Sequence, residues 1–174
     1  MTPTTPFLCA TCGETHSNFP MVFGANAPLA WFEIPPEDRE QRAVLSSDQC
    51  IIDRKHFYVL GRLLIPIKNE HEAFTWLAWV SLSPENFERM DELWESEGRE
   101  AEPPYFGWLS TSLPGYPTTL NLKCNVITQP VGTRPLIALE PTLHPLAVDQ
   151  REGVGAVRLR AMVEAALHSS QAIQ

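Results

Sequence analysis

Two neighbouring segments, HFYVLGRLLIPIK (residues 56–68) and FTWLAWVSLS (residues 74–83), carry apolar side chains at alternate positions. Successive side chains of a β-strand point to opposite faces, whereas a helix needs apolar residues three and four positions apart. The segments therefore predict two long strands. Leu77 and Trp79 make the second face of the later segment partly apolar as well, which indicates a central strand covered on both sides.

The rest of the chain is divided into short elements. Its 16 prolines, about twice the usual share, lie mostly between apolar runs. Further strands are predicted over 49–53, 105–111, 118–128 and 135–140. A helix is predicted over 84–97, with Ser83 as its N-cap and Gly98 just past its end, and a second helix begins near Gly155.

Consecutive strands with short connections predict the α+β class. We expect one domain over 7–168, with a mainly antiparallel sheet of about five or six strands and helices packed on it. Residues 1–6 are expected to form a disordered N-terminal tail and 169–174 a C-terminal tail. The competing architecture is a parallel, doubly wound sheet.

Charge and hydropathy restrict the partners. The chain of 174 residues has 13 basic and 21 acidic residues and a net charge of −8. Such a charge repels nucleic acid and anionic membrane surfaces. The first residues lack the charged and apolar regions of a secretory signal, and no run approaches the roughly 18 apolar residues of a membrane helix. We therefore expect a cytoplasmic protein whose four cysteines are thiols or metal ligands.

The segment FLCATCGETH (residues 7–16) is the local pattern with the most chemical specificity. A redox Cys-x-x-Cys pair normally follows a strand and opens a helix, but only eight residues precede Cys9 and Gly13 disfavours a helix. A zinc knuckle fits better, because two thiolates at this spacing can bind one ion and the glycine lets the backbone turn. We therefore predict a structural zinc ion on Cys9 and Cys12.

One cysteine pair supplies half of a tetrahedral site, so other residues must complete it. Cys50, at the edge of a predicted strand, is the preferred further ligand, followed by His16. His56 is a weaker candidate, and Cys124 falls on an apolar strand face where a buried thiol needs no other explanation. The alternative is that Cys9 and Cys12 are two reduced thiols near the chain terminus.

Two other groups of residues deserve testing against the structure. His144 lies near Glu140 and Asp149 and could act as a base, but Pro145 favours a histidine that caps or packs at a helix start. Trp108 and Tyr116 belong to YFGWLSTSLPGYP, where aromatic residues either line a binding groove or pack in the core. The sequence therefore favours a capping or packing role for His144 and leaves the role of the aromatic group open.

The order of motifs resembles a bacterial family known only as a domain of unknown function, number twenty-one ninety-nine. The motifs are the N-terminal CxxCGExH, the strand FTWLAWVSLS, and the segments GWLSTSLPGYPTTLNLK and RPLIALEPTLHPLAVDQREG. The resemblance extends from Cys9 to about His168. It implies a single-domain bacterial protein and assigns no activity and no catalytic residue.

Two classes of function are compatible with these features. The first is a non-enzymatic binding or interaction module with a structural zinc knuckle and a protein partner, with Trp108, Tyr116 and His144 as candidate binding residues. The second is a metal-dependent, hydrolase-like enzyme that uses the zinc site, or His144 with nearby carboxylates. A catalytic site gathers polar groups from several elements around a pocket, and the strand patterns assign most positions to packing. We therefore favour the module.

Overall fold

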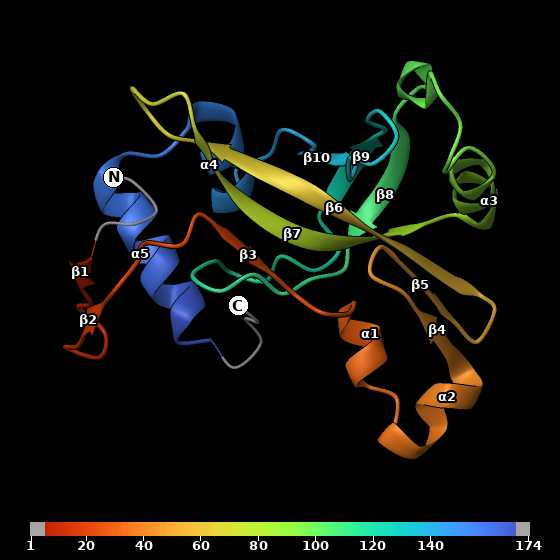
Figure 1. The fold of residues 1–174 in the computed structure, drawn as a ribbon, viewed down its shortest axis with the longest axis horizontal. Helices are drawn as coiled ribbons and strands as arrows, with labels where there is room; N and C mark the ends of the chain where they lie inside the picture. Colours follow the sequence, from red (N-terminus) through yellow and green to blue (C-terminus); the bar gives the residue numbers. More distant parts are fainter. Residues whose placement is uncertain (1–5, 170–174) are drawn as a thin grey trace.

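The computed structural model describes residues 6–169 (Figure 1). It is a mixed structure of helices and strands. Five consecutive strands form its centre: β6 (His56–Pro66), β7 (Ala73–Leu82), β8 (Tyr105–Leu109), β9 (Lys123–Ile127) and β10 (Leu136–Leu139). The predicted tails lie, apart from Pro6 and Ser169, outside the described residues.

The central strands form a closed, mixed barrel, which corrects the prediction of a mainly antiparallel sheet. The pairs β6–β7, β7–β8, β8–β9 and β9–β10 are antiparallel. The ring closes where β10 pairs with β6 in parallel, with Leu136 opposite Arg62. The sheet is therefore a five-stranded mixed barrel. The long pair β6–β7 is antiparallel over ten residue pairs, so a parallel doubly wound sheet is excluded as well.

The parallel seam is short and is supported by side chains. The backbone N–H of Arg62 donates to the carbonyl of Pro135 at 2.8 Å. Beyond this point the side-chain amide of Gln150 bonds to the β10 backbone, accepting from Leu139 N–H and donating to Ile137 C=O, both at 2.8 Å. A side-chain amide thus supplies the hydrogen bonds that a neighbouring strand would make.

Shorter strands extend this sheet. The strand β3 (Val22–Gly24) lies parallel to β7, and β5 (Gln49–Ile52) and β4 (Ala43–Leu45) continue antiparallel from β6. Short helical elements connect them: α1 (Leu29–Phe32), η1 (Pro36–Asp38) and α2 (Arg39–Arg42). A second, smaller apolar cluster forms around Trp79 on the outer face of β6 and β7.

The helices begin where the local sequence signals predict. Helix α3 (Pro84–Glu92) starts after Ser83, whose side chain accepts a hydrogen bond from Asn86 N–H, and it ends before the predicted residue 97. It is followed by η2 (Arg99–Ala101), α4 (Pro145–Glu152) and α5 (Ala156–Leu167). The buried apolar residues of α5, which include Leu159, Met162 and Val163, belong to the main core.

A small hairpin of β1 (Phe7–Leu8) and β2 (Thr15–His16) lies beside α5, so the two ends of the described chain meet (Figure 1). The ring of Phe7 is buried and packs edge-on against Phe19 at 5.1 Å between centroids. Within residues 6–169, no helix is both long enough and apolar enough to span a lipid bilayer.

Candidate metal centre

Four side chains that can ligate a metal converge between the β1–β2 hairpin and the end of α5. The ligand atoms of Cys9, Cys12, His16 and His168 all lie within 4.8 Å of one another. Cys9 Sγ is 3.2 Å from His168 Nε2, and Cys12 Sγ is 3.5 Å from His16 Nε2. Tetrahedral zinc, with bonds of about 2.3 Å to sulfur and 2.0 Å to nitrogen, holds its ligand atoms at similar separations.

The hairpin turn brings the two cysteines together. Gly13 N–H donates to Cys9 C=O at 3.0 Å, and Cys9 N–H donates to Glu14 C=O at 2.9 Å. Gly13 has a φ of 74°, a left-handed conformation that costs glycine little because it has no Cβ. His16 follows Cys12 by four residues and lies on the returning strand β2. Its ring stacks on that of Phe7, with 5.2 Å between the ring centroids.

Helix α5 contributes the fourth ligand and holds the hairpin in place. Arg160, Glu164 and His168 are spaced four residues apart, so they form one stripe along the helix. Glu164 Oε1 accepts hydrogen bonds from the backbone N–H of Ala10 at 2.9 Å and from Arg160 Nε at 3.0 Å. Arg160 also donates to the carbonyl of Leu8. This stripe therefore binds the hairpin backbone at Leu8 and Ala10 and also supplies His168.

The local hydrogen bonds favour one thiolate. Burial of Cys9 opposes its ionisation, but the N–H groups of Cys12 and Thr11 and the ring of His168 outweigh burial and lower the pKa of the thiol to about 6. For Cys12, Glu14 N–H lowers the pKa, but burial and the neighbouring Cys9 together raise it above the usual value. A second thiolate beside the first is thus unfavourable until a cation is bound.

This donor set suits zinc. Two thiolates and two imidazoles form the Cys₂His₂ combination of structural zinc sites, and soft sulfur ligands disfavour magnesium and calcium. Cys9 is 1% exposed, while Cys12 and His168 are exposed and His16 is half-buried. The residues present therefore fit Zn²⁺, with one buried ligand and a side that is open for entry of the ion.

Cys50 does not belong to this cluster, which corrects its prediction as the preferred ligand. It lies on β5, away from the hairpin (Figure 1), and is fully buried in the smaller apolar cluster. Burial raises the pKa of its thiol to about 11, so it behaves as an apolar core residue. Cys124 is also fully buried, and burial raises the pKa of its thiol to about 12. His56 begins β6 and is not in the cluster.

His144 caps a helix. Its Nδ1 accepts a hydrogen bond from Leu146 N–H at 3.2 Å, and its Nε2 lies 3.2 Å from the carbonyl of Thr118. Both ring nitrogens are therefore engaged, with the proton on Nε2. Asp149 accepts hydrogen bonds from the Tyr116 hydroxyl at 2.8 Å and from Arg158 at 3.0 Å rather than from His144. Among the described residues, neither Glu140 nor Asp149 forms an ion pair with His144, so the suggested base has no paired carboxylate.

The aromatic candidates separate as well. Trp108 is 39% exposed on β8, with its ring 5.3 Å from that of Phe106. Tyr116 is held between Asp149 and the guanidinium of Arg158, which lies 4.7 Å from its ring centroid. Burial and the Asp149 carboxylate raise the pKa of Tyr116. The side chain of Trp108 therefore lies at the surface, whereas that of Tyr116 packs between the 113–116 loop and the C-terminal helices.

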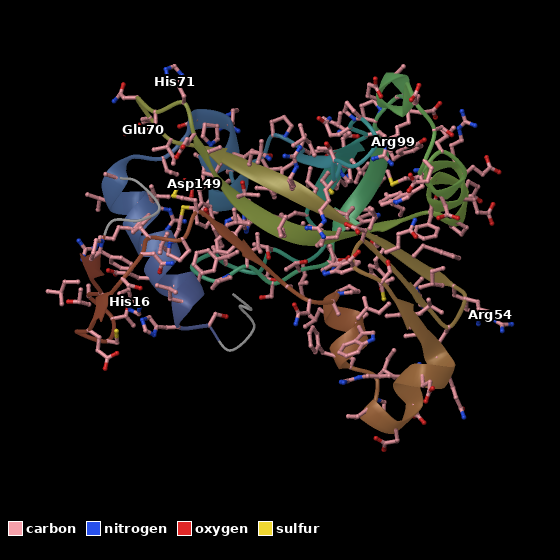
Figure 2. All side chains as sticks on the ribbon, viewed as in Figure 1. His16, Arg54, Glu70, His71, Arg99 and Asp149 are labelled. Atoms are coloured by element: carbon pink, nitrogen blue, oxygen red, sulfur yellow. The ribbon has the colours of Figure 1, made fainter. Side chains whose placement is uncertain are left out.

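Sequence reasoning found three residues of the metal cluster and missed His168. Figure 2 labels His16 at one end of the view, at the hairpin that meets α5. The signal in the sequence was the polar stripe Arg160, Glu164 and His168, which pointed to a solvent-facing side of a helix. No local spacing relates that stripe to a cysteine pair about 160 residues earlier.

Comparison with known proteins places the chain in a family. Residues 8–154 match the family described as "Uncharacterized protein conserved in bacteria (DUF2199)". The chain therefore belongs to this bacterial family of uncharacterised proteins, in agreement with the resemblance in its motifs. The matched segment contains Cys9, Cys12 and His16 and ends before α5. No curated protein and no solved structure matched the chain.

Proposed function

We propose that this protein is a non-enzymatic interaction module held together by a structural Zn²⁺ ion on Cys9, Cys12, His16 and His168. The observation that carries the proposal is the convergence of four ligand atoms within 4.8 Å from opposite ends of the chain. An ion at this position would fasten the β1–β2 hairpin to α5. Its binding free energy would then contribute directly to the stability of the fold.

The number of ligands supports a structural rather than a catalytic ion. Four protein ligands fill a tetrahedral site, whereas a catalytic zinc keeps one position for water or substrate. The alternative of His144 acting as a base receives no support, since both of its ring nitrogens are engaged. A metal-dependent hydrolase is thus the weaker proposal.

A protein partner would be expected at exposed aromatic side chains. Phe106 and Trp108 project from β8 with 41% and 39% of their surface exposed, and their rings form an edge-to-face pair. Aromatic residues are enriched in protein interfaces because they bury a large area at a small cost in side-chain entropy. This pair is where we expect the module to contact its partner.

Metal analysis of protein purified without a histidine tag tests the proposal. We expect about one equivalent of zinc per chain, and Cys12→Ser should weaken zinc binding more than about 100-fold in competition with a chromophoric chelator. Cys12 is exposed, so this substitution should not disturb packing. Replacement of zinc by Co²⁺ should give the visible absorption of tetrahedral, thiolate-bound cobalt.

The matched control is Cys50→Ser, at a buried cysteine outside the cluster. It should lower stability but leave the zinc content unchanged. Chelation of the metal should lower the melting temperature of the wild type and increase hydrogen exchange in the hairpin. Wild-type protein with less than about a tenth of an equivalent of zinc, and with a melting temperature insensitive to added zinc, would refute the proposal.

A further inference from the structure

Two open hollows, neither of them lined by a residue of the metal cluster, meet at one arginine. The larger has a volume of about 400 Å³, with Leu60, Leu77 and Trp79 in its lining. The smaller, of about 180 Å³, is lined by Trp94, Arg99 and the 131–133 turn. Arg134 lines both, so we call them together the Arg134 groove. Figure 2 shows Arg99 and His16 at opposite ends of the molecule.

The smaller hollow contains a buried cation without a counter-ion. Arg99 is only 5% exposed, and its guanidinium donates to four backbone carbonyls, those of Trp94, Gln129, Pro130 and Thr133. Within residues 6–169 no carboxylate forms an ion pair with it. Carbonyl dipoles orient the guanidinium, but its full positive charge remains, and buried charges are normally paired with an opposite charge.

Two more arginines surround the same loop. Arg134 donates from Nε to Asp48 at 2.5 Å and from one terminal nitrogen to Ser47 C=O at 3.4 Å. Arg62 donates from Nε to the carbonyl of Arg134 at 3.3 Å. In the part of the chain that the structure describes, Arg62 makes no ion pair, so its terminal nitrogens remain available as donors.

The charge near the groove is opposite in sign to the net charge of the protein. The lining of the two hollows holds two guanidiniums, those of Arg99 and Arg134, and two carboxylates, of which Asp48 is already bonded to Arg134 and to the Ser47 hydroxyl, while Glu95 is exposed. Arg62 lines neither hollow but lies beside them, next to Leu77 and bonded to the Arg134 carbonyl, and adds a third guanidinium. The protein as a whole carries a net charge of −8. A local excess of positive charge in an acidic protein, next to a hollow, favours an anionic ligand.

The larger hollow offers an apolar floor beside these charges. Leu60 and Trp79 are register partners on β6 and β7, as are Arg62 and Leu77, so all four side chains share the outer face of the pair. Gly24 lets β3 lie close beside β7 at this point, because it is the register partner of Leu77 and a Cβ there would lie 2.8 Å from that of Leu77. The groove therefore runs from an apolar surface to a cluster of guanidiniums.

We propose that the Arg134 groove binds a small amphipathic oxyanion, either a carboxylate or a phosphate monoester with an apolar body. The apolar part of the ligand would lie on Val22 and Leu77, above the buried Leu60 and Trp79, and the oxyanion would accept hydrogen bonds from Arg134. Arg62 and Arg99 add positive charge at the same end. Binding involves no ligand of the metal cluster, so this proposal is independent of the proposed zinc site.

The test is calorimetric titration of the full chain with five probes, supported by tryptophan fluorescence because Trp79 and Trp94 line the groove. Octanoate and octyl phosphate each have an apolar chain and an anionic group. 1-Octanol has the apolar chain without the anionic group, and acetate and inorganic phosphate have the anionic group without an octyl chain. We expect saturable binding of at least one amphiphile, weakened by added salt, and at least about tenfold weaker binding of the three incomplete probes.

Two variants locate the site. Arg134→Gln should weaken amphiphile binding at least about tenfold by removing the charged donor. Val22→Glu, at a groove-lining position that is 53% exposed, should weaken it through repulsion without affecting folding. Arg42→Gln is the matched control, since Arg42 also pairs with one aspartate at the surface but lies outside the groove. It should bind like the wild type.

The two amphiphiles identify the preferred head group, and preference for either supports the proposal. Cys12→Ser should bind them as the wild type does, which separates this result from the zinc test. Absence of saturable binding of both amphiphiles up to about 10 mM would overturn the proposal. So would equal affinity for octanol, or unchanged affinity in both Arg134→Gln and Val22→Glu.

Discussion

Cys9 Sγ and His168 Nε2 lie 3.2 Å apart although 159 positions separate them in the chain. The contact joins the first hairpin to the end of the last described helix. Because the intervening chain forms the barrel, a metal bond at this contact would close a loop around almost the whole fold. Cross-links that close long loops restrict the unfolded chain most strongly, so an ion here would have a large stabilising effect.

The first prediction separates two histidines near the C-terminal helices. His168→Ala should weaken zinc binding more than about 100-fold, because it leaves three protein ligands. His144→Ala removes a helix cap instead and should lower stability by about 1 kcal/mol with zinc affinity unchanged. Chelator competition and thermal unfolding measure the two effects. Equal zinc affinity in His168→Ala and the wild type would remove His168 from the site.

The second prediction concerns Glu164 as a positioning residue. Glu164→Ala leaves Ala10 N–H without its acceptor and should weaken zinc binding about 10- to 100-fold, while the saturated protein still holds one ion. Glu164→Gln keeps an acceptor for Ala10 and should retain most of the affinity. Affinities from chelator competition, compared with total zinc at saturation, distinguish a positioning residue from a ligand. A lower stoichiometry at saturation in Glu164→Ala would contradict this role.

The metal cluster shows what local sequence can and cannot predict. The pair Cys9 and Cys12 with His16 is compact in sequence, so ligand spacing alone indicates it. His168 depends on where α5 docks, which the packing of its apolar face decides. Cys50 was preferred because a strand edge is a plausible meeting point, but alternation along β5 turns its side chain into an apolar cluster. The residue types of the near half of the cluster were therefore predictable from the sequence, and the convergence with a distant helix was not.

The fold likewise has features that local sequence predicts and features that depend on residues far apart in the chain. Alternating apolar residues predicted β6 and β7 almost to their ends, and Ser83 predicted the start of α3. Closure of the barrel depends instead on distant partners. Gly61 admits Ile137, whose nearest atom would lie 2.7 Å from an added Cβ, and Gln150 bonds to the free edge of β10. Neither residue carries a pattern that reveals its partner.

The third prediction tests the packing of the barrel wall. A Cβ on Gly107 would lie 2.7 Å from the backbone carbonyl of Ser81 and 2.5 Å from Val80 Cγ1. Gly107→Ala should therefore lower the free energy of unfolding by roughly 2 kcal/mol, since the β7–β8 pair must move apart. Gly155→Ala is the control because an added Cβ there meets no atom within 4 Å. Urea unfolding measures the free energy of unfolding of both variants. Equal values would contradict the prediction, because they would mean that the β7–β8 pair accommodates the added methyl group without loss of stability.

The fourth prediction is a pH dependence at the Asp48–Arg134 pair. Burial raises the pKa of Asp48, but hydrogen bonds from Ser47 and Arg134 outweigh burial and lower the pKa below its usual range. A carboxyl whose folded-state pKa is depressed stabilises the fold above its unfolded pKa of about 3.9, and this stabilisation is lost as the pH falls through the folded-state value. Asp48→Asn should thus lower the free energy of unfolding by roughly 1 kcal/mol at pH 7, a figure discounted for the partial exposure of the pair. The loss should become progressively smaller below about pH 3.9.

Urea unfolding of wild type, Asp48→Asn, Arg134→Gln and the double variant gives the coupling energy of the pair at each pH. A cost of Asp48→Asn that is independent of pH, or is as large in the Arg134→Gln background, would mean that the pair does not stabilise the fold through its charge.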